Sequence, residues 1–138
     1  SEARRKVKSF NLEIVTPDGL VFSGEAESIL VHTDDGDVEI LAGHMDYMAS
    51  VATGRARITV GGVSKYASCS GGFLTVTKDG GKLAAVTFEF AENIDVERAR
   101  AAKERAEGKL ATATDEREIA LAKARLERAL TRIKVATL

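Results

Sequence analysis

The chain changes character abruptly near Asn93, and this change limits the folds that it can adopt. Eleven of its 12 glycines lie at or before Gly81, and every aromatic residue precedes Asn93. The remainder is rich in alanine, arginine and glutamate, with Gly108 as its one glycine. Glycine serves turns and aromatic residues favour strands, whereas alanine favours helix. The sequence therefore predicts two regions of different structure, 1–91 and 92–138.

The first region is predicted to form short strands separated by tight turns. Short apolar or alternating runs lie between clusters of glycine with aspartate or proline, such as residues 16–19. The expected strands lie at residues 10–14, 29–31, 38–40, 58–60, 66–68, 73–75 and 83–88. No helical pattern separates them, which argues against a parallel α/β sheet. The pattern predicts an antiparallel sandwich or barrel.

The second region is predicted to form two helices that pair as an antiparallel hairpin. Asn93 or Asp95 caps the first helix, and the second begins near Thr114 and ends near Val135. Gly108 and the small residues before Thr114 interrupt the pattern. The first stripe comprises Val96, Ala99, Ala102, Ala106 and Leu110. The second comprises Ile119, Ala122, Leu126, Ala129 or Leu130, and Ile133.

The alanine-rich seam of this hairpin is thin. Alanine buries little apolar area, and an isolated helix of roughly 15 residues is marginal in water. The hairpin therefore depends on what it packs against, which is either the first region or a groove between other chains. If these two states differ by a few kcal/mol, a small ligand decides between them, which makes the hairpin a candidate switch.

Charge is distributed unevenly, although the net charge is only -1. Nine acidic residues and no basic ones lie between Lys8 and Arg55. The last helix is basic, and its cations are Lys123, Arg125, Arg128, Arg132 and Lys134. These are either two solvated faces or a basic helix that meets an acidic surface, on this protein or on another. The small net charge gives no reason to expect nucleic acid or membrane lipid as a partner.

No catalytic or metal-binding constellation is found in the sequence. His32 and His44 have no third ligand nearby, and residues 34–39 lack the spacing of a calcium loop, so they are interpreted as a solvated turn. Cys69 is interpreted as a small buried apolar residue. The glycine pairs lack a following lysine and helix of P-loop type. With no long apolar segment, we expect a chain of the cytoplasm or of a complex facing it.

The chain resembles the epsilon subunit of bacterial F-type ATP synthase over nearly its whole length. The resemblance rests on Ile14-Val15-Thr16-Pro17-Asp18-Gly19, Ile40-Leu41-Ala42-Gly43-His44, Ser70-Gly71-Gly72-Phe73-Leu74, Ile94-Asp95-Val96-Glu97-Arg98-Ala99 and Arg128-Ala129-Leu130-Thr131-Arg132-Ile133-Lys134-Val135. Five such segments in order form a specific signal. The chain departs from the family at Ala42, where proline is usual, at Cys69, where an aliphatic residue is usual, and at residues 45–47.

The resemblance implies an α+β fold, a β-sandwich followed by a helical hairpin, and no catalysis. It implies a place on the central stalk beside the gamma subunit and the ion-translocating c ring, peripheral to the cell membrane on its cytoplasmic side. In many members the hairpin extends into the catalytic hexamer and inhibits ATP hydrolysis. Lys123, Arg125, Arg128 and Arg132 would then meet acidic segments of the catalytic beta and alpha subunits.

The resemblance also implies a regulatory nucleotide site, although no cofactor is required. Some members bind ATP on the folded hairpin through a motif that Ile94, Asp95, Arg98 and Ala99 match. By family position the site would also include Glu89, Arg105, Arg128 and Arg132. Arginines that converge from two helices suit a polyphosphate. In the simpler interpretation, Asp95 is an ordinary helix cap and Arg98 and Arg105 form an exposed helix face.

A third hypothesis is a free-standing sandwich enzyme that uses the hairpin as an oligomerisation arm. The missing catalytic constellation argues against it.

Overall fold

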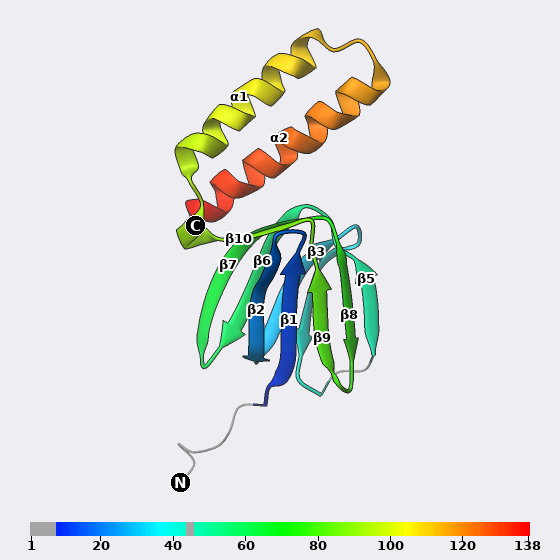
Figure 1. The fold of residues 1–138 in the computed structure, drawn as a ribbon, viewed down its shortest axis with the longest axis vertical. Helices are drawn as coiled ribbons and strands as arrows, with labels where there is room; N and C mark the ends of the chain where they lie inside the picture. The colour runs from blue at the N-terminus through cyan, green and yellow to red at the C-terminus, as the bar shows by residue number, and fades with distance from the viewer. Residues whose placement is uncertain (1–7, 44–45) are drawn as a thin grey trace.

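A computed structural model describes residues 8–43 and 46–138, and it consists of a β-sandwich with a helical hairpin on one end (Figure 1). The predicted α+β class is confirmed. His44 lies outside the described residues, so the judgement on a zinc site between His32 and His44 is not tested.

The sandwich consists of two five-stranded sheets. Sheet A has the order β2 (Gly19–Ala26), β1 (Phe10–Thr16), β9 (Gly80–Ala84), β8 (Phe73–Thr77) and β5 (Tyr47–Ser50). Sheet B has the order β10 (Thr87–Phe90), β7 (Val63–Ser70), β6 (Gly54–Val60), β3 (Ser28–Thr33) and β4 (Gly36–Leu41). Of the two architectures that the sequence left open, the chain therefore adopts the sandwich. Strands β2 and β5 were not among the expected strands.

The core lies between the two sheets and follows from strand alternation. In β1, Leu12 and Ile14 point inward and are fully buried, as are Ile29 of β3, Leu74 of β8 and Leu83 of β9. Each such side chain contributes about 1.5–3 kcal/mol by leaving water. The pairing is antiparallel except between β1 and β9, which run parallel. That parallel pair brings the start and the end of the sandwich region together.

The prediction of one strand over residues 83–88 is wrong, because the chain changes sheets there. The amide of Ala85 donates to the carbonyl of Val15 in sheet A (2.9 Å), and the next amide, Val86, donates to Ser70 in sheet B (3.1 Å). Gly72 lies against this crossing with φ +115°, and a Cβ on it would lie 2.2 Å from the carbonyl oxygen of Ala84. Only glycine fits both the backbone conformation and the contact.

The hairpin consists of α1 (Val96–Thr112) and α2 (Glu116–Ala136). The Asp95 carboxylate accepts the Arg98 amide at 3.0 Å and caps α1, one of the two predicted possibilities. Asp115 caps α2 by accepting the Arg117 amide at 2.8 Å, and the helix begins at Glu116, close to the predicted start near Thr114. The helix α1 continues through Gly108, because one glycine costs only about 1 kcal/mol among good helix formers.

The seam between the two helices is made of alanine, as predicted. Ala99 and Ala106 of α1 and Ala122 and Ala129 of α2 are all buried, whereas Leu130 is 44% exposed. Ala129, and not Leu130, is therefore the seam residue at the position where the sequence allowed either.

Only the base of the hairpin contacts the sandwich, and its tip extends away from it (Figure 1). The C-terminal end of α2 packs on β6, β7 and the short 3-10 helix η2 (Ala91–Asn93). Val135 of α2 and Ile94 at the start of the hairpin are buried at this base, with exposed fractions of 2% and 8%. The apolar contacts between the long arm and the sandwich are therefore concentrated at the base, which is where a site between the two parts can form.

Candidate functional site

A polar cavity of about 400 Å³ lies at the base of the hairpin, between β10 and the two helices. Its walls are Glu89, Asn93, Asp95, Arg98, Ala99, Ala102, Arg105 and Arg132. Six of the eight residues proposed for a nucleotide site are among them, namely Glu89, Asp95, Arg98, Ala99, Arg105 and Arg132. The fold thus brings together side chains that are up to 43 positions apart in the sequence.

One ion pair crosses this cavity from the arm to the sandwich. The Nε of Arg132 on α2 donates to Oε1 of Glu89 on β10 at 3.0 Å. Glu89 pairs with Ser68 in the ladder between β10 and β7, which fixes the strand from which its carboxylate projects. Both side chains are only partly exposed, 29% for Arg132 and 37% for Glu89. The pair therefore connects the two parts of the molecule where water is partly excluded.

Two further guanidinium groups line the cavity without a partner. Arg98 and Arg105 project from α1, and their side chains form no ion pair with any residue that the structure describes. Asp95 is the acidic residue beside them, and one of its oxygens already accepts the Arg98 amide. Asp95 therefore acts as a helix cap whatever else it does. The cavity has a surplus of positive charge, which suits a ligand with several anionic groups.

A second cavity of about 350 Å³ continues along the groove between the helices. It shares Ala102, Arg105 and Arg132 with the first cavity and adds Arg125 and Arg128 from α2 and Lys109 from α1. Arg128, the seventh predicted site residue, lies here and not in the first cavity. Sequence reasoning missed Lys109, although its spacing of four from Arg105 places both on one face of α1.

Ile94 is the predicted site residue that lines neither cavity. Its side chain is buried, with 8% exposed, and it anchors the start of the hairpin. The predicted partner-contact residues also separate in the structure. Arg125, Arg128 and Arg132 line the cavities, whereas Lys123 is exposed and lines neither. Among the described residues, Arg132 is the one predicted partner-contact cation that forms an ion pair.

The sandwich itself offers little for catalysis or metal binding. Residues 34 and 35 form the turn of the β3–β4 hairpin, as interpreted from the sequence, whereas residues 36–39 belong to β4. Within the described ranges, no group of three or more His, Cys, Asp or Glu is placed to hold a metal ion. Cys69 is buried as expected, and burial raises the pKa of its thiol to about 12, so it stays protonated and inert near neutral pH. No helix in the described part is long and apolar enough to cross a membrane.

Comparison with known families covers both parts of the molecule. Residues 9–91 match the model of the ATP synthase, Delta/Epsilon chain, beta-sandwich domain, and residues 92–137 match that of the ATP synthase, Delta/Epsilon chain, long alpha-helix domain.

The chain belongs to the ATP synthase delta/epsilon family.

Similar curated proteins of this family match along almost their whole length. The ATP synthase epsilon chain of Bacillus velezensis is 41% identical, and the match covers 94% of this chain and 98% of that one. The ATP synthase epsilon chain of Caldanaerobacter subterraneus is 40% identical, with coverage of 94% and 95%. The resemblance to the epsilon subunit is confirmed, and with it a non-catalytic subunit. The hypothesis of a free-standing enzyme is excluded.

Solved structures of ATP synthases contain chains with the same fold. A chain in the Euglena gracilis mitochondrial ATP synthase, whose structure includes OSCP, F1 and the c-ring, superposes with a TM-score of 0.80 at 24% identity. The match covers 100% of this epsilon-family chain and 88% of that chain. A chain of the Tetrahymena thermophila central stalk and c-ring gives a TM-score of 0.66 at 16% identity, covering 95% and 98%. At these identities the likeness concerns the fold alone.

Proposed function

We propose that this epsilon-family subunit docks its sandwich on the gamma subunit and the c ring and regulates ATP hydrolysis with its hairpin. It would associate with the cell membrane only through the complex, on the cytoplasmic side. The observation that carries the regulatory part is the cationic cavity at the base of a weakly anchored arm. An anionic ligand in this cavity would contact the arm and the sandwich at once. Its binding would therefore favour the folded state of the arm.

The arm is built so that its two states can lie close in free energy. Its inner seam is alanine, and its base rests on few apolar side chains, chiefly Ile94 and Val135. A ligand shifts such an equilibrium only by its difference in affinity for the two states, and about 5.5 kcal/mol reverses a ratio of one to 99. Several charge-assisted hydrogen bonds, each worth about 1.5–3 kcal/mol, supply free energy on that scale.

ATP is the proposed ligand of the folded state. Arg98 and Arg105 are unpaired cations among the described residues and would bind phosphate oxygens, while Arg132 would divide its donors between Glu89 and the nucleotide. Arg105 and Arg132 project from different helices of the arm, so a nucleotide that binds both would hold the two helices together beside β10. The arrangement requires no catalysis, so ATP acts as a regulator and not as a substrate of this subunit.

Protection of the hairpin by ATP tests the sensing proposal. Hydrogen exchange of the α2 amides is measured on the full chain with and without millimolar ATP. We expect ATP to slow exchange and the Arg98→Ala variant to abolish the effect. Arg100→Ala is the matched control, because Arg100 also lies on α1 but pairs with Glu97 at 2.9 Å and lines neither cavity. If ATP leaves exchange unchanged in the unmodified chain, nucleotide sensing is refuted.

In the released state, the basic face of α2 is proposed to contact acidic segments of the catalytic beta and alpha subunits. Lys123, Arg125 and Arg128 form no ion pair within the described residues, so they are available for that role. Removing residues 93–138 from the reconstituted complex should raise its ATP hydrolysis while the sandwich still co-purifies with gamma. Unchanged hydrolysis in a fully assembled complex would contradict the inhibitory role, and loss of co-purification would contradict the docking role.

A further inference from the structure

A third cavity, of about 420 Å³, separates the last turns of α2 from sheet B. It shares no lining residue with the two cavities that contain the predicted nucleotide residues. Its polar walls are His32, Asp37, Thr53 and Arg55 from the sandwich, with Thr131 and Lys134 from α2. The base of the hairpin is therefore polar in a second place, to which the family resemblance assigned no role.

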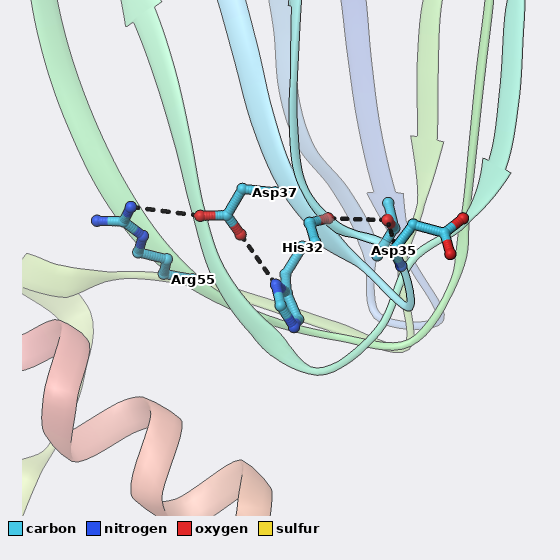
Figure 2. Close-up of polar contacts among 6 residues, drawn as sticks. His32, Asp35, Asp37 and Arg55 are labelled. Atoms are coloured by element: carbon cyan, nitrogen blue, oxygen red, sulfur yellow. Dashed lines mark hydrogen bonds and ion pairs between the residues drawn. The ribbon is translucent and has the colours of Figure 1, made fainter.

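The sandwich wall of this cavity is a chain of three charged or titratable side chains on neighbouring strands. Nδ1 of His32 lies 2.9 Å from Oδ1 of Asp37, and Nη2 of Arg55 lies 3.3 Å from Oδ2 of the same carboxylate (Figure 2). The hydrogen bond from His32, together with Arg55, holds the pKa of Asp37 below its ordinary value. The two oxygens of the Asp37 carboxylate are thus already engaged, one by His32 and the other by Arg55.

The imidazole of His32 is held in place by its contact with β6. A Cβ on Gly54 would lie 2.7 Å from Cβ of His32, so the absence of a side chain at Gly54 lets the histidine approach this strand. In Figure 2 the side chain of Asp35 points away from the group formed by His32, Asp37 and Arg55. The nearby turn therefore adds no second carboxylate to this wall.

The helix wall contributes an unpaired cation. Lys134 is exposed and forms no ion pair or hydrogen bond through its side chain with any described residue. It lines the same cavity as Arg55, which also lies over the ring of Tyr66 at 5.7 Å. Two cationic side chains, Arg55 and Lys134, thus face the single side-chain carboxylate of Asp37, which already pairs with Arg55. The side chains that line the cavity therefore carry one unbalanced positive charge, which an anionic ligand would balance.

We propose that this cavity binds a phosphate-class oxyanion between Lys134 of α2 and Arg55 and His32 of sheet B. Arginine and lysine are the usual phosphate-binding side chains, and Nε2 of His32 can also donate when the imidazole carries both protons, because Nδ1 faces Asp37. The oxyanion bridges arm and sandwich and holds the hairpin folded. It is either inorganic phosphate or a phosphoryl group of a larger molecule, since both present the same oxygens.

The charged groups that face His32 are Asp37 on β4, Arg55 on β6 and Lys134 on α2. An imidazole with both protons donates to Asp37 and to the oxyanion at once, whereas one with its single proton on Nδ1 has no second donor. Arg55 and Lys134 therefore supply the donors that do not depend on the state of His32.

The test follows the imidazole signals of the full chain by NMR while inorganic phosphate is added at constant ionic strength. The chain has two histidines, so His44→Gln assigns the signals. We expect a saturable shift of the His32 signals, weakened about tenfold or more by Lys134→Gln, the loss expected for one charge-assisted contact. Arg117→Gln, on the same helix but outside the cavity, should bind as the unmodified chain does. Equal titrations of the Lys134→Gln and unmodified chains, or a shift that never saturates, would overturn the proposal.

The Arg98→Ala variant separates this site from the proposed nucleotide site. In that variant, a saturable His32 shift with phosphate but not with ATP identifies the free ion as the ligand. A shift with ATP alone identifies a phosphoryl group of a larger molecule, and both results support the oxyanion site. No shift with either ligand refutes the site. That negative result would leave the nucleotide proposal standing, because its own test is ATP protection of α2 in the unmodified chain.

Discussion

Arg132 and Glu89 form an ion pair of 3.0 Å that joins the last helix to the last strand of the sandwich. Both residues also line the cavity at the base of the arm. This ion pair helps to hold the arm folded when no ligand is bound. The two side chains that form it also line the cavity in which a ligand would bind.

Breaking this pair should loosen the docked arm by a small, measurable amount. A partly exposed ion pair is worth roughly 0.2–1 kcal/mol, so Glu89→Gln and Arg132→Gln should each speed exchange of the α2 amides, and the double variant should show coupling of that size. Hydrogen exchange measured by NMR on all four proteins tests this. Arg100→Gln breaks a pair within α1 and should leave docking unchanged. Strict additivity of the two changes would show that the pair contributes nothing.

Enlarging the alanine seam should separate the helices. Ala122 is 3% exposed and faces α1, so Ala122→Leu forces extra side-chain volume into the seam at a cost of about 1–3 kcal/mol. Ala124→Leu is the control, because Ala124 is exposed on the same helix. We expect the first variant to lower the melting temperature of the helical signal in circular dichroism and the second to leave it nearly unchanged. Equal effects would mean that the seam is not close-packed.

Two glycine-to-alanine changes should act in opposite directions. Gly72→Ala meets the Ala84 carbonyl and requires alanine at a positive φ, so it should destabilise the sandwich by ~3 kcal/mol or more. Gly108→Ala lies in α1 with nothing within 4 Å and should stabilise the helix by about 1 kcal/mol. Urea unfolding of both variants measures the difference. A tolerated alanine at position 72 would contradict the close approach at the sheet crossing.

Acid should weaken the contact between β3, β4 and β6. The folded-state pKa of Asp37 lies below its ordinary value of 3.8, so the stability that it contributes is present above that value. This stability is lost as the pH falls through the lowered pKa. Asp37→Asn should therefore lower the free energy of unfolding at neutral pH and have little effect at about pH 2. Denaturant titrations at both pH values test the sign, and an equal loss at both would rule out the ionised carboxylate as the cause.

Local chemistry explains which parts of the fold were predictable. The turn at residues 16–19, the cap at Asp95 and the alanine seam all depend on residues close in sequence, and their physical preferences are strong. The sheet change between Ala85 and Val86 was not predictable, because the apolar run gives no local sign of it. It depends on Val15 and Ser70, which lie far away in the sequence.

The candidate site likewise has parts that the sequence predicted and parts that only the folded structure shows. Family position suggested Arg98 and Arg132 together, yet only the folded chain shows that Arg132 is already engaged by Glu89 and that Ile94 faces the interior. The cavity around Lys134 gave no sequence signal, because its walls come from three strands and one helix, and no short motif contains them.

The sheet crossing at Ala85 also determines how the arm is attached. Beyond it the chain forms β10, a four-residue strand at the edge of sheet B that pairs with β7 and leads through η2 to the hairpin. Once the base of α2 has left β6 and β7, any pulling force or torque on the arm is therefore transmitted through this one short ladder. Under mechanical load, β10 should peel from β7 before the inner strands separate, which would lengthen the tether of the arm while the sandwich stays intact.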